Sequence, residues 1–128
     1  MYTARSNSTV INCTFSGNTA TYYGGGGGMA NDHCTLTVNS CTFNGNTANS
    51  YYGGGMINGF DTTVTVSDCI LWGNSPDQID TVKSVVTILR FSAVQGGFPG
   101  TVNGGGNIYR DPVFVRPPNP GLTAGGMA

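Results

Sequence analysis

Apolar and polar positions recur along this chain with a period of about 28 residues, which falls in the range of repeat proteins. The segments CTFSGNTA, CTFNGNTA and CILWGNSP begin at Cys13, Cys41 and Cys69, at equal intervals. Three further columns keep the same spacing: Val10, Val38 and Val66; Phe15, Phe43 and Leu71; and Asn18, Asn46 and Asn74. Such a fixed period is typical of solenoids, in which each repeat stacks on its neighbours.

The pattern inside each repeat predicts strands that are joined by a tight bend. Cys41 and Phe43 alternate as residues of one strand do, but Val38 lies three positions before Cys41 and is out of phase by one. The same slip occurs in the repeats on either side, so we expect bends at residues 11–12, 39–40 and 67–68. Asn is suited to the left-handed conformation that such a bend needs.

A second landmark, GGGM, ends at Met29 and again at Met56, an interval one position shorter than that of the columns. The loops between the strands therefore accommodate differences of one residue in length, while the strands keep their register. With a short strand around each GGGM, the second repeat is predicted to hold three strands, near residues 27–30, 35–38 and 41–43.

A shorter fourth repeat runs from Val86 to Gly97, where the pattern of the third repeat recurs at a reduced interval in Leu89, Ser92 and Val94. The predicted fold is all-β: a right-handed, single-stranded parallel β-helix with three strands per coil and about four coils. We expect the coils and a closing segment to occupy residues 1–115 and an irregular Pro/Gly-rich tail to occupy residues 116–128.

The composition favours strands and turns over helices. The 128 residues include 21 Gly but only five Lys or Arg and six Asp, with no Glu, and the formal net charge is -1. No run of basic residues is present, so nucleic acid is disfavoured as a partner, and no apolar stretch approaches the ~20 residues that span a bilayer. We expect no cofactor and no membrane insertion.

The motifs FSGN and FNGN, each followed by GGGM, resemble the repeats of polymorphic outer-membrane proteins and of bacterial choice-of-anchor or right-handed β-helix repeat proteins. The segments CILWGNSPDQI, AVQGGFPG and NIYRDPVFV look like the C-terminal coils of such arrays, so the resemblance covers roughly residues 8–115. It implies a pectin-lyase-like β-helix from a secreted or cell-surface parent protein with adhesive or carbohydrate-facing roles.

The first residues of the chain contain no recognisable targeting signal. Residues 1–10 lack the apolar core of a secretion signal, so we expect the chain as given to be soluble and to be a fragment of the parent that the resemblance implies. The tail, PPNPGLTAGGMA, does not look like a further coil or an anchor.

The aligned positions are expected to act as structural ladders. Strand stacking at ~4.8 Å leaves parallel Cys side chains too far apart for a relaxed disulfide, so we predict free, buried thiols at Cys13, Cys41 and Cys69. The Asn column is expected to share side-chain hydrogen bonds at a corner, and the column of Phe15, Phe43 and Leu71 to stack in the core. No metal site is expected, since C-x-x-C and a second His are absent.

Asp32, His33 and Cys34 form the one cluster that invites a catalytic interpretation. Alternation along an extended segment sends His33 and Cys34 to opposite sides, so an exposed corner histidine is the preferred interpretation and no catalytic residue is assigned.

The best candidate contact surface is formed by tyrosines in the Gly-rich loops of two repeats: Tyr22, Tyr23, Tyr51 and Tyr52. Exposed rings there could stack on sugar faces, or they could shield the core. The preferred hypothesis is a non-catalytic structural or adhesive surface module that contacts carbohydrate. Two alternatives stay open: a fragment of a carbohydrate-active lyase or hydrolase, and a unit that self-associates through open coil ends.

Overall fold

The computed structural model describes residues 1–22, 25–49, 51–82, 85–97 and 101–114, and over these residues every regular element is a strand. All paired strands are parallel. The prediction of an all-β chain is therefore confirmed, and its parallel pairing is what a β-helix requires. The predicted tail at residues 116–128 lies outside the described residues.

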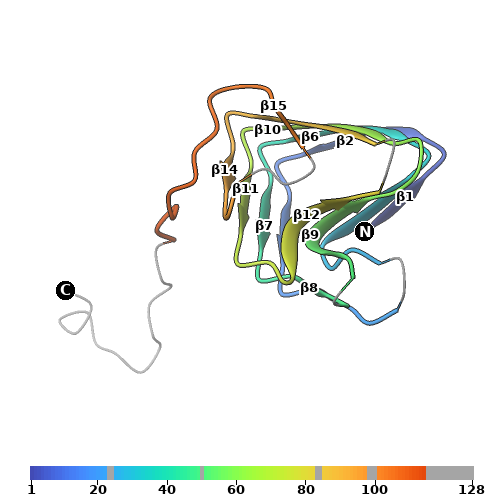
Figure 1. The fold of residues 1–128 in the computed structure, drawn as a ribbon, viewed down its shortest axis with the longest axis horizontal. Helices are drawn as coiled ribbons and strands as arrows, with labels where there is room; N and C mark the ends of the chain where they lie inside the picture. The colour runs from blue at the N-terminus through green and yellow to red at the C-terminus, as the bar shows by residue number, and fades with distance from the viewer. Residues whose placement is uncertain (23–24, 50, 83–84, 98–100, 115–128) are drawn as a thin grey trace.

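The strands form three main sheets and one short sheet, seen end-on in Figure 1. The first sheet has the order β1 (Tyr2–Ala4), β5 (Met29–Asp32), β9 (Gly53–Asn58) and β12 (Asp77–Thr81). The second sheet has the order β15 (Val102–Asn103), β13 (Val86–Arg90), β10 (Thr63–Ser67), β6 (Thr35–Asn39) and β2 (Asn7–Ile11). The third sheet has the order β14 (Ala93–Val94), β11 (Ile70–Trp72), β7 (Thr42–Asn44) and β3 (Thr14–Ser16), and the short sheet pairs β4 (Thr19–Ala20) with β8 (Thr47–Ala48).

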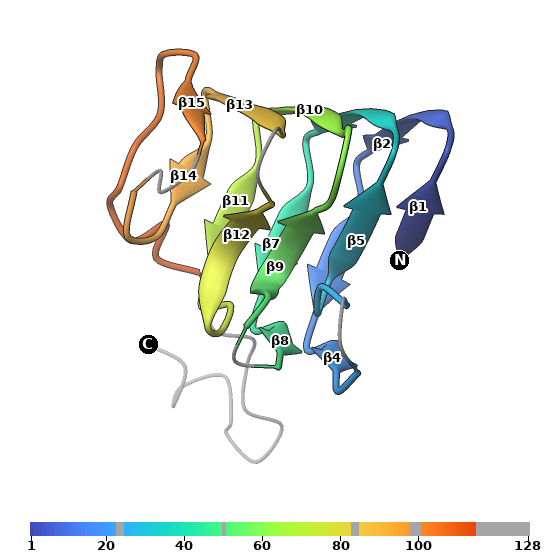
Figure 2. The same ribbon diagram turned by 45° about the vertical axis from the view of Figure 1, so that its right-hand side comes forward.

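The strand registers reproduce the columns of the sequence repeat. In the second sheet Val10 pairs with Val38 and Val66 with Leu89, and in the third sheet Phe15 pairs with Phe43. Neighbouring strands in each sheet thus come from consecutive repeats, which lie side by side in Figure 2. The predicted strands of the second repeat correspond to β5, β6 and β7, and a further short strand, β8, follows them.

The core lies between the three main sheets (Figure 1). Each sheet contributes side chains that are fully buried: Met29 and Met56 from the first, Leu36, Val38, Val64, Val66 and Leu89 from the second, and Phe43, Leu71 and Val94 from the third. The Phe15 and Phe43 rings are stacked with their centroids 4.6 Å apart. One continuous apolar core therefore links all the repeats.

The bends between strands are made by residues with positive φ. At the predicted bends these are Asn12, Ser40 and Asp68, so the left-handed residue is the second of each pair and Asn39 does not take this role. Two more left-handed columns, which the sequence pattern did not reveal, mark the other corners: Arg5, His33 and Asp61, and Gly17, Gly45 and Gly73. Asn, Asp and His suit such positions because their short polar side chains can bond the local backbone, and Gly suits them because it has no Cβ.

The glycine runs before Met29 and Met56 are required by close packing between repeats. A Cβ on Gly28 would lie 2.7 Å from the carbonyl oxygen of Gly55, and one on Gly55 would lie 2.4 Å from that of Gln78. The backbone of Gly28 donates a hydrogen bond to Gly54 O at 3.0 Å, which fixes this approach. No side chain fits between the successive repeats here.

Candidate functional site

A groove of about 600 Å³ lies over the first sheet. Its floor includes Ala30 and Ile57, which pair with each other in β5 and β9 and alternate with the core residues Met29 and Met56. Ala30 and Ile57 thus belong to the outer side of the sheet, yet they are almost fully buried. The groove is lined by Tyr2, Ala30, Asn31, Asp32, Tyr52, Ile57, Gly59, Phe60 and Val82.

Three aromatic residues from different elements line this groove. Tyr2 lies in β1 and pairs with Ala30, Tyr52 precedes β9, and Phe60 follows it. Tyr2 and Phe60 are largely exposed, whereas Tyr52 is half-buried. Aromatic rings beside an apolar floor form a concave surface of the kind that binds small organic groups.

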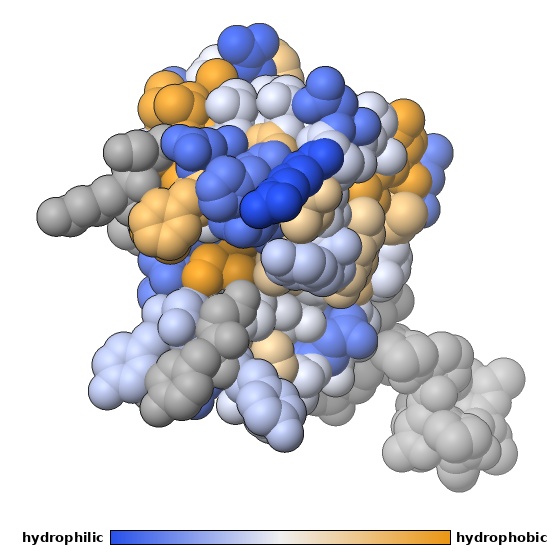
Figure 3. Space-filling view, turned by 90° about the vertical axis from the view of Figure 1, so that its right-hand side faces the viewer, coloured by the Kyte–Doolittle hydropathy of each residue, from blue (hydrophilic) through white to orange (hydrophobic). Residues whose placement is uncertain are grey.

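Charged groups stand next to the groove at the corner between β5 and β6. His33 Nδ1 lies 2.9 Å from Asp32 Oδ2, and His33 Nε2 lies 3.8 Å from Asp61 Oδ2. His33 has φ of 48° and is exposed, as the sequence predicted for a corner histidine, while Cys34 is buried on the other side. Figure 3, which views the right-hand side of Figure 1, shows hydrophilic groups at the centre of this face with hydrophobic groups around them.

The predicted tyrosine surface does not come together as one site. Tyr52 lines the groove, but Tyr51 is 73% exposed and does not line it. Tyr22 is 84% exposed and borders a separate shallow hollow beside Met1, and Tyr23 lies outside the described residues. The repeat pattern did not reveal Tyr2 and Phe60 as candidates, because no repeat column includes them and only the sheet pairing brings them to the groove that Tyr52 lines.

The Asn column forms a chain of side-chain hydrogen bonds. Asn46 Oδ1 accepts bonds from the backbone N–H and the side-chain amide of Asn18, both at 3.0 Å. Asn46 Nδ2 in turn donates to Phe15 O at 2.8 Å and to Asn74 Oδ1 at 2.9 Å. Asn46 is completely buried, and its amide oxygen and nitrogen are both bonded within the chain, as buried polar groups generally are.

The Cys column is also built from hydrogen bonds. Cys41 Sγ lies 3.4 Å from the backbone N of Cys13, and Cys69 Sγ lies 3.4 Å from that of Cys41. Ser92 continues the column, since its Oγ accepts the N–H of Cys69 at 3.1 Å. Each of these side chains accepts a hydrogen bond from a backbone N–H group next to a bend. The column therefore supplies hydrogen-bond acceptors at successive corners.

All four cysteines are free. Cys13 differs from the prediction because it is exposed: it lies next to β3, which stands at the edge of the third sheet and pairs only with β7. Burial raises the pKa of the Cys34 and Cys41 thiols and raises that of Cys69 to about 11. Thiols with raised pKa are poor nucleophiles at neutral pH, because little of the reactive thiolate is present.

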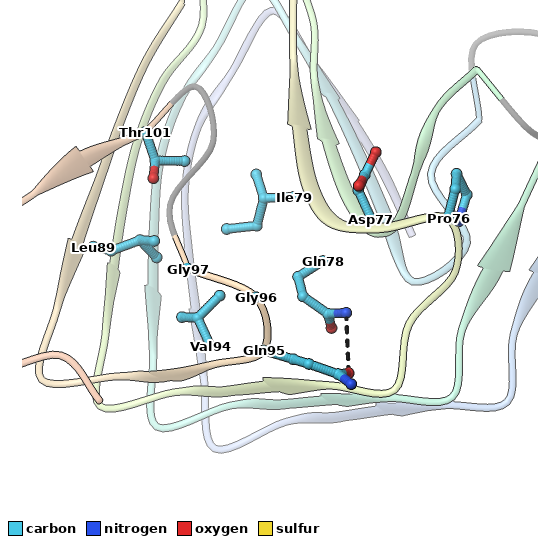
Figure 4. Close-up of a pocket in the computed structure, with 10 residues that line it drawn as sticks. All are labelled: Pro76, Asp77, Gln78, Ile79, Leu89, Val94, Gln95, Gly96, Gly97 and Thr101. Carbon is cyan, nitrogen blue, oxygen red and sulfur yellow. Dashed lines mark hydrogen bonds between the residues drawn. The ribbon is translucent and has the colours of Figure 1, made fainter. Parts of the chain in front are cut away.

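A second hollow, of about 270 Å³, lies at the end of the core beside β12 and β14 (Figure 4). Ile79, Leu89 and Val94 form its apolar part. Gln78 and Gln95 point toward each other, and Gln78 Nε2 donates to Gln95 Oε1 at 3.4 Å. The two glutamine amides thus bond to each other within the chain. The residues that line this hollow differ from those of the groove over the first sheet, so the two are separate.

The described residues hold no cluster of three His, Cys, Asp or Glu side chains arranged as a metal would need. In the same part of the chain, no helix has the length and apolar character to cross a membrane. Comparisons with protein-family models, with curated proteins and with solved structures gave no match to this chain.

Proposed function

We propose that the chain is a right-handed parallel β-helix, with three strands per coil and about four coils, that serves as a non-catalytic surface module and binds carbohydrate over its first sheet. Parallel pairing between repeats supports the coil arrangement, and parallel crossovers are right-handed in about 98% of cases. The resemblance to polymorphic outer-membrane protein repeats supports a secreted or cell-surface parent.

The groove over the first sheet is the observation that carries the binding proposal. Tyr2, Tyr52 and Phe60 offer ring faces on which sugar rings can stack, above the apolar floor of Ala30 and Ile57. Asp32 lines the same groove and can accept hydrogen bonds from sugar hydroxyl groups. Its negative charge would repel uronic acids, so the proposed ligand is an extended neutral polysaccharide.

Native affinity electrophoresis tests this proposal with two probes, soluble xylan as a neutral polysaccharide and polygalacturonate as an acidic one. Xylan is expected to retard the protein, and polygalacturonate is not. Tyr52→Ala is expected to weaken retardation by roughly tenfold, which corresponds to about 1.4 kcal/mol for one lost ring contact. Tyr51→Ala is the matched control, because Tyr51 is exposed outside the groove. Equal retardation of wild type and Tyr52→Ala would rule out this groove.

A second candidate, a carbohydrate-active enzyme fragment, rests on the cluster of Asp32, His33 and Asp61 beside the groove. An imidazole between two carboxylates can transfer protons, although the Nε2 to Asp61 distance of 3.8 Å is longer than a hydrogen bond. Incubation with xylan and polygalacturonate, followed by measurement of reducing ends and of unsaturated products, separates the two candidates. Binding without product formation is expected.

A further inference from the structure

The charged corner beside the groove over the first sheet holds the carboxylate of Asp32 in a fixed position. His33 Nδ1 lies 2.9 Å from Asp32 Oδ2. On the other side, a Cβ on Gly59 would lie 2.7 Å from Asp32 Oδ1, so a glycine is needed there to leave room for the carboxylate. The backbone N–H of Gly59 donates to Asn31 O at 2.7 Å, which brings the next repeat this close. Asp32 is therefore held at the groove between His33 and the backbone of Gly59.

The contact with Asp32 decides where His33 takes up a proton. An ionised carboxylate only accepts hydrogen bonds, so Nδ1 is the donor and carries the hydrogen of the neutral imidazole. A further proton therefore binds at Nε2, which faces Asp61 Oδ2 at 3.8 Å. Protonation turns Nε2 into a donor directed at Asp61. The side chains of His33 and Asp61 are 42% and 79% exposed, so they have room to close the gap to a hydrogen bond.

Charged groups of three consecutive repeats meet at this corner. Arg5, His33 and Asp61 occupy the same left-handed position in their repeats, and Arg5 N donates to Asp32 O at 3.1 Å. Among the described residues, the other titratable side chains next to the corner or the groove are two tyrosines, one buried cysteine and one aspartate: Tyr2, Tyr52, Cys34 and Asp80. Histidine is the side chain whose ordinary change of charge falls between about pH 5 and 8. Together with Arg5 and the two carboxylates, the corner carries one net negative charge while His33 is neutral and none once His33 is protonated.

We propose that His33 sets the charge preference of the groove: while its imidazole is neutral the groove takes only neutral polysaccharide, and once it is protonated the groove also takes acidic polysaccharide. This inference rests on the carbohydrate binding proposed above for the same groove. Asp32 lines the groove, and its charge repels a uronate while nothing offsets it. An imidazolium 2.9 Å away offsets that charge, and Asp32 can still accept hydrogen bonds from sugar hydroxyl groups. His33 thus acts through Asp32, as a positioning and specificity-determining residue.

Biolayer interferometry on the immobilised full chain tests this inference, with xylan as the neutral probe and polygalacturonate as the acidic one. Binding is measured at about pH 7.5 and about pH 5.5, on either side of the usual titration of histidine. Carboxylic acids titrate near about pH 4, so the acidic probe stays ionised at both values. Xylan is expected to bind equally at both. Polygalacturonate is expected to bind roughly fivefold more tightly at the lower pH, which is the effect of one unit charge at close range in water.

Two substitutions of His33 separate its charge from its place in the corner, and other corners show that both new residues fit. Arg5 has φ of 49° at the equivalent position of the preceding repeat, and Asn12 has φ of 54° at another corner. His33→Arg keeps a positive charge at both pH values, so polygalacturonate should bind with the tighter affinity at both. His33→Asn carries no charge, so polygalacturonate should bind with the weaker affinity at both, while xylan binding is kept. Circular dichroism checks that each variant keeps its β structure.

Asp68→Asn is the matched control, because it changes the net charge by the same one unit at a different, exposed corner and should leave the pH response of the wild type intact. A pH response that persists in His33→Asn overturns the inference, because it then comes from another group or from the polysaccharide. Wild-type binding of polygalacturonate that is equal at the two pH values, while xylan binds, also overturns it. Absence of xylan binding at both pH values instead overturns the proposed function, and the inference with it.

Discussion

The side-chain oxygen of Asn74 accepts two hydrogen bonds from Asn46, one from the backbone N–H at 3.0 Å and one from the side-chain amide at 2.9 Å. Each of these asparagines follows a glycine with positive φ, Gly73 and Gly45. The strand ladder is interrupted at such a corner, and the asparagine side chain supplies the missing acceptor. The amide bonds thus extend the contact between repeats around the corner.

Replacement of Asn46 by Ala is expected to lower the free energy of unfolding by roughly 1–3 kcal/mol, since it removes the buried bond to Asn74 and leaves the part-buried N–H of Asn18 and carbonyl of Phe15 without their partner. Chemical denaturation measures the loss. Asn7→Ala is the control, because Asn7 is exposed in β2, and it should change stability by less than about 0.5 kcal/mol. Equal effects of the two substitutions would contradict a structural role for the column.

Two glycines are expected to differ in their tolerance of a methyl group. Gly45→Ala places Ala at φ of 64° with open space around its Cβ, so only backbone strain of about 1–2 kcal/mol is expected. Gly55→Ala brings a Cβ to 2.4 Å from Gln78 O, so the repeats must separate locally and the loss should exceed that of Gly45→Ala. Thermal unfolding of the two variants compares them directly, and a milder effect at Gly55 would show that the repeats are not packed this closely.

Stability is expected to fall in alkaline solution because of Cys69. Its folded pKa of about 11 lies above the reference value of 9.0, so the neutral thiol is favoured in the folded state. This contribution to the free energy of unfolding is fully present below pH 9 and is lost as the pH rises through 11. Its size is about 2 kcal/mol once partial screening by solvent is allowed for.

Cys69→Ser keeps a hydrogen-bond acceptor in the column, as Ser92 already does, but does not titrate in this range. The free energy of unfolding of the variant should therefore decline less steeply between pH 9 and 11 than that of the wild type. Parallel curves for the two proteins would show that Cys69 is not the group responsible.

Thiol reactivity should distinguish the first repeat from the others. In dilute native protein, a disulfide reagent such as Ellman's is expected to react rapidly with Cys13 and slowly with Cys34, Cys41 and Cys69, because only Cys13 is exposed. In denaturant all four thiols should react. Fewer than four reactive thiols in denaturant would indicate a disulfide, and more than one fast thiol in native protein would indicate that a corner holding a buried cysteine opens.

The repeat columns alone were enough to predict much of the fold. One column consists of residues that pair directly in neighbouring strands: Val10, Val38 and Val66. Strand pairing between repeats needs side chains of the same kind at the same position, so the column predicted the register. The phase slip before Cys41 located a bend, although the left-handed residue proved to be Ser40 and not Asn39. Local pattern was sufficient here because the interactions themselves repeat along the chain.

The groove was decided by tertiary structure alone. Tyr2, Tyr52 and Phe60 belong to no common column, and they line one groove because the pairing of β1, β5 and β9 brings three separate segments together. The exposure of Cys13 likewise follows from its place next to β3 at the edge of the third sheet, which a repeating motif cannot encode. The sequence by itself determined what each repeat buries, whereas the folded stack decided which side chains meet on its surface, because such contacts join residues that share no period.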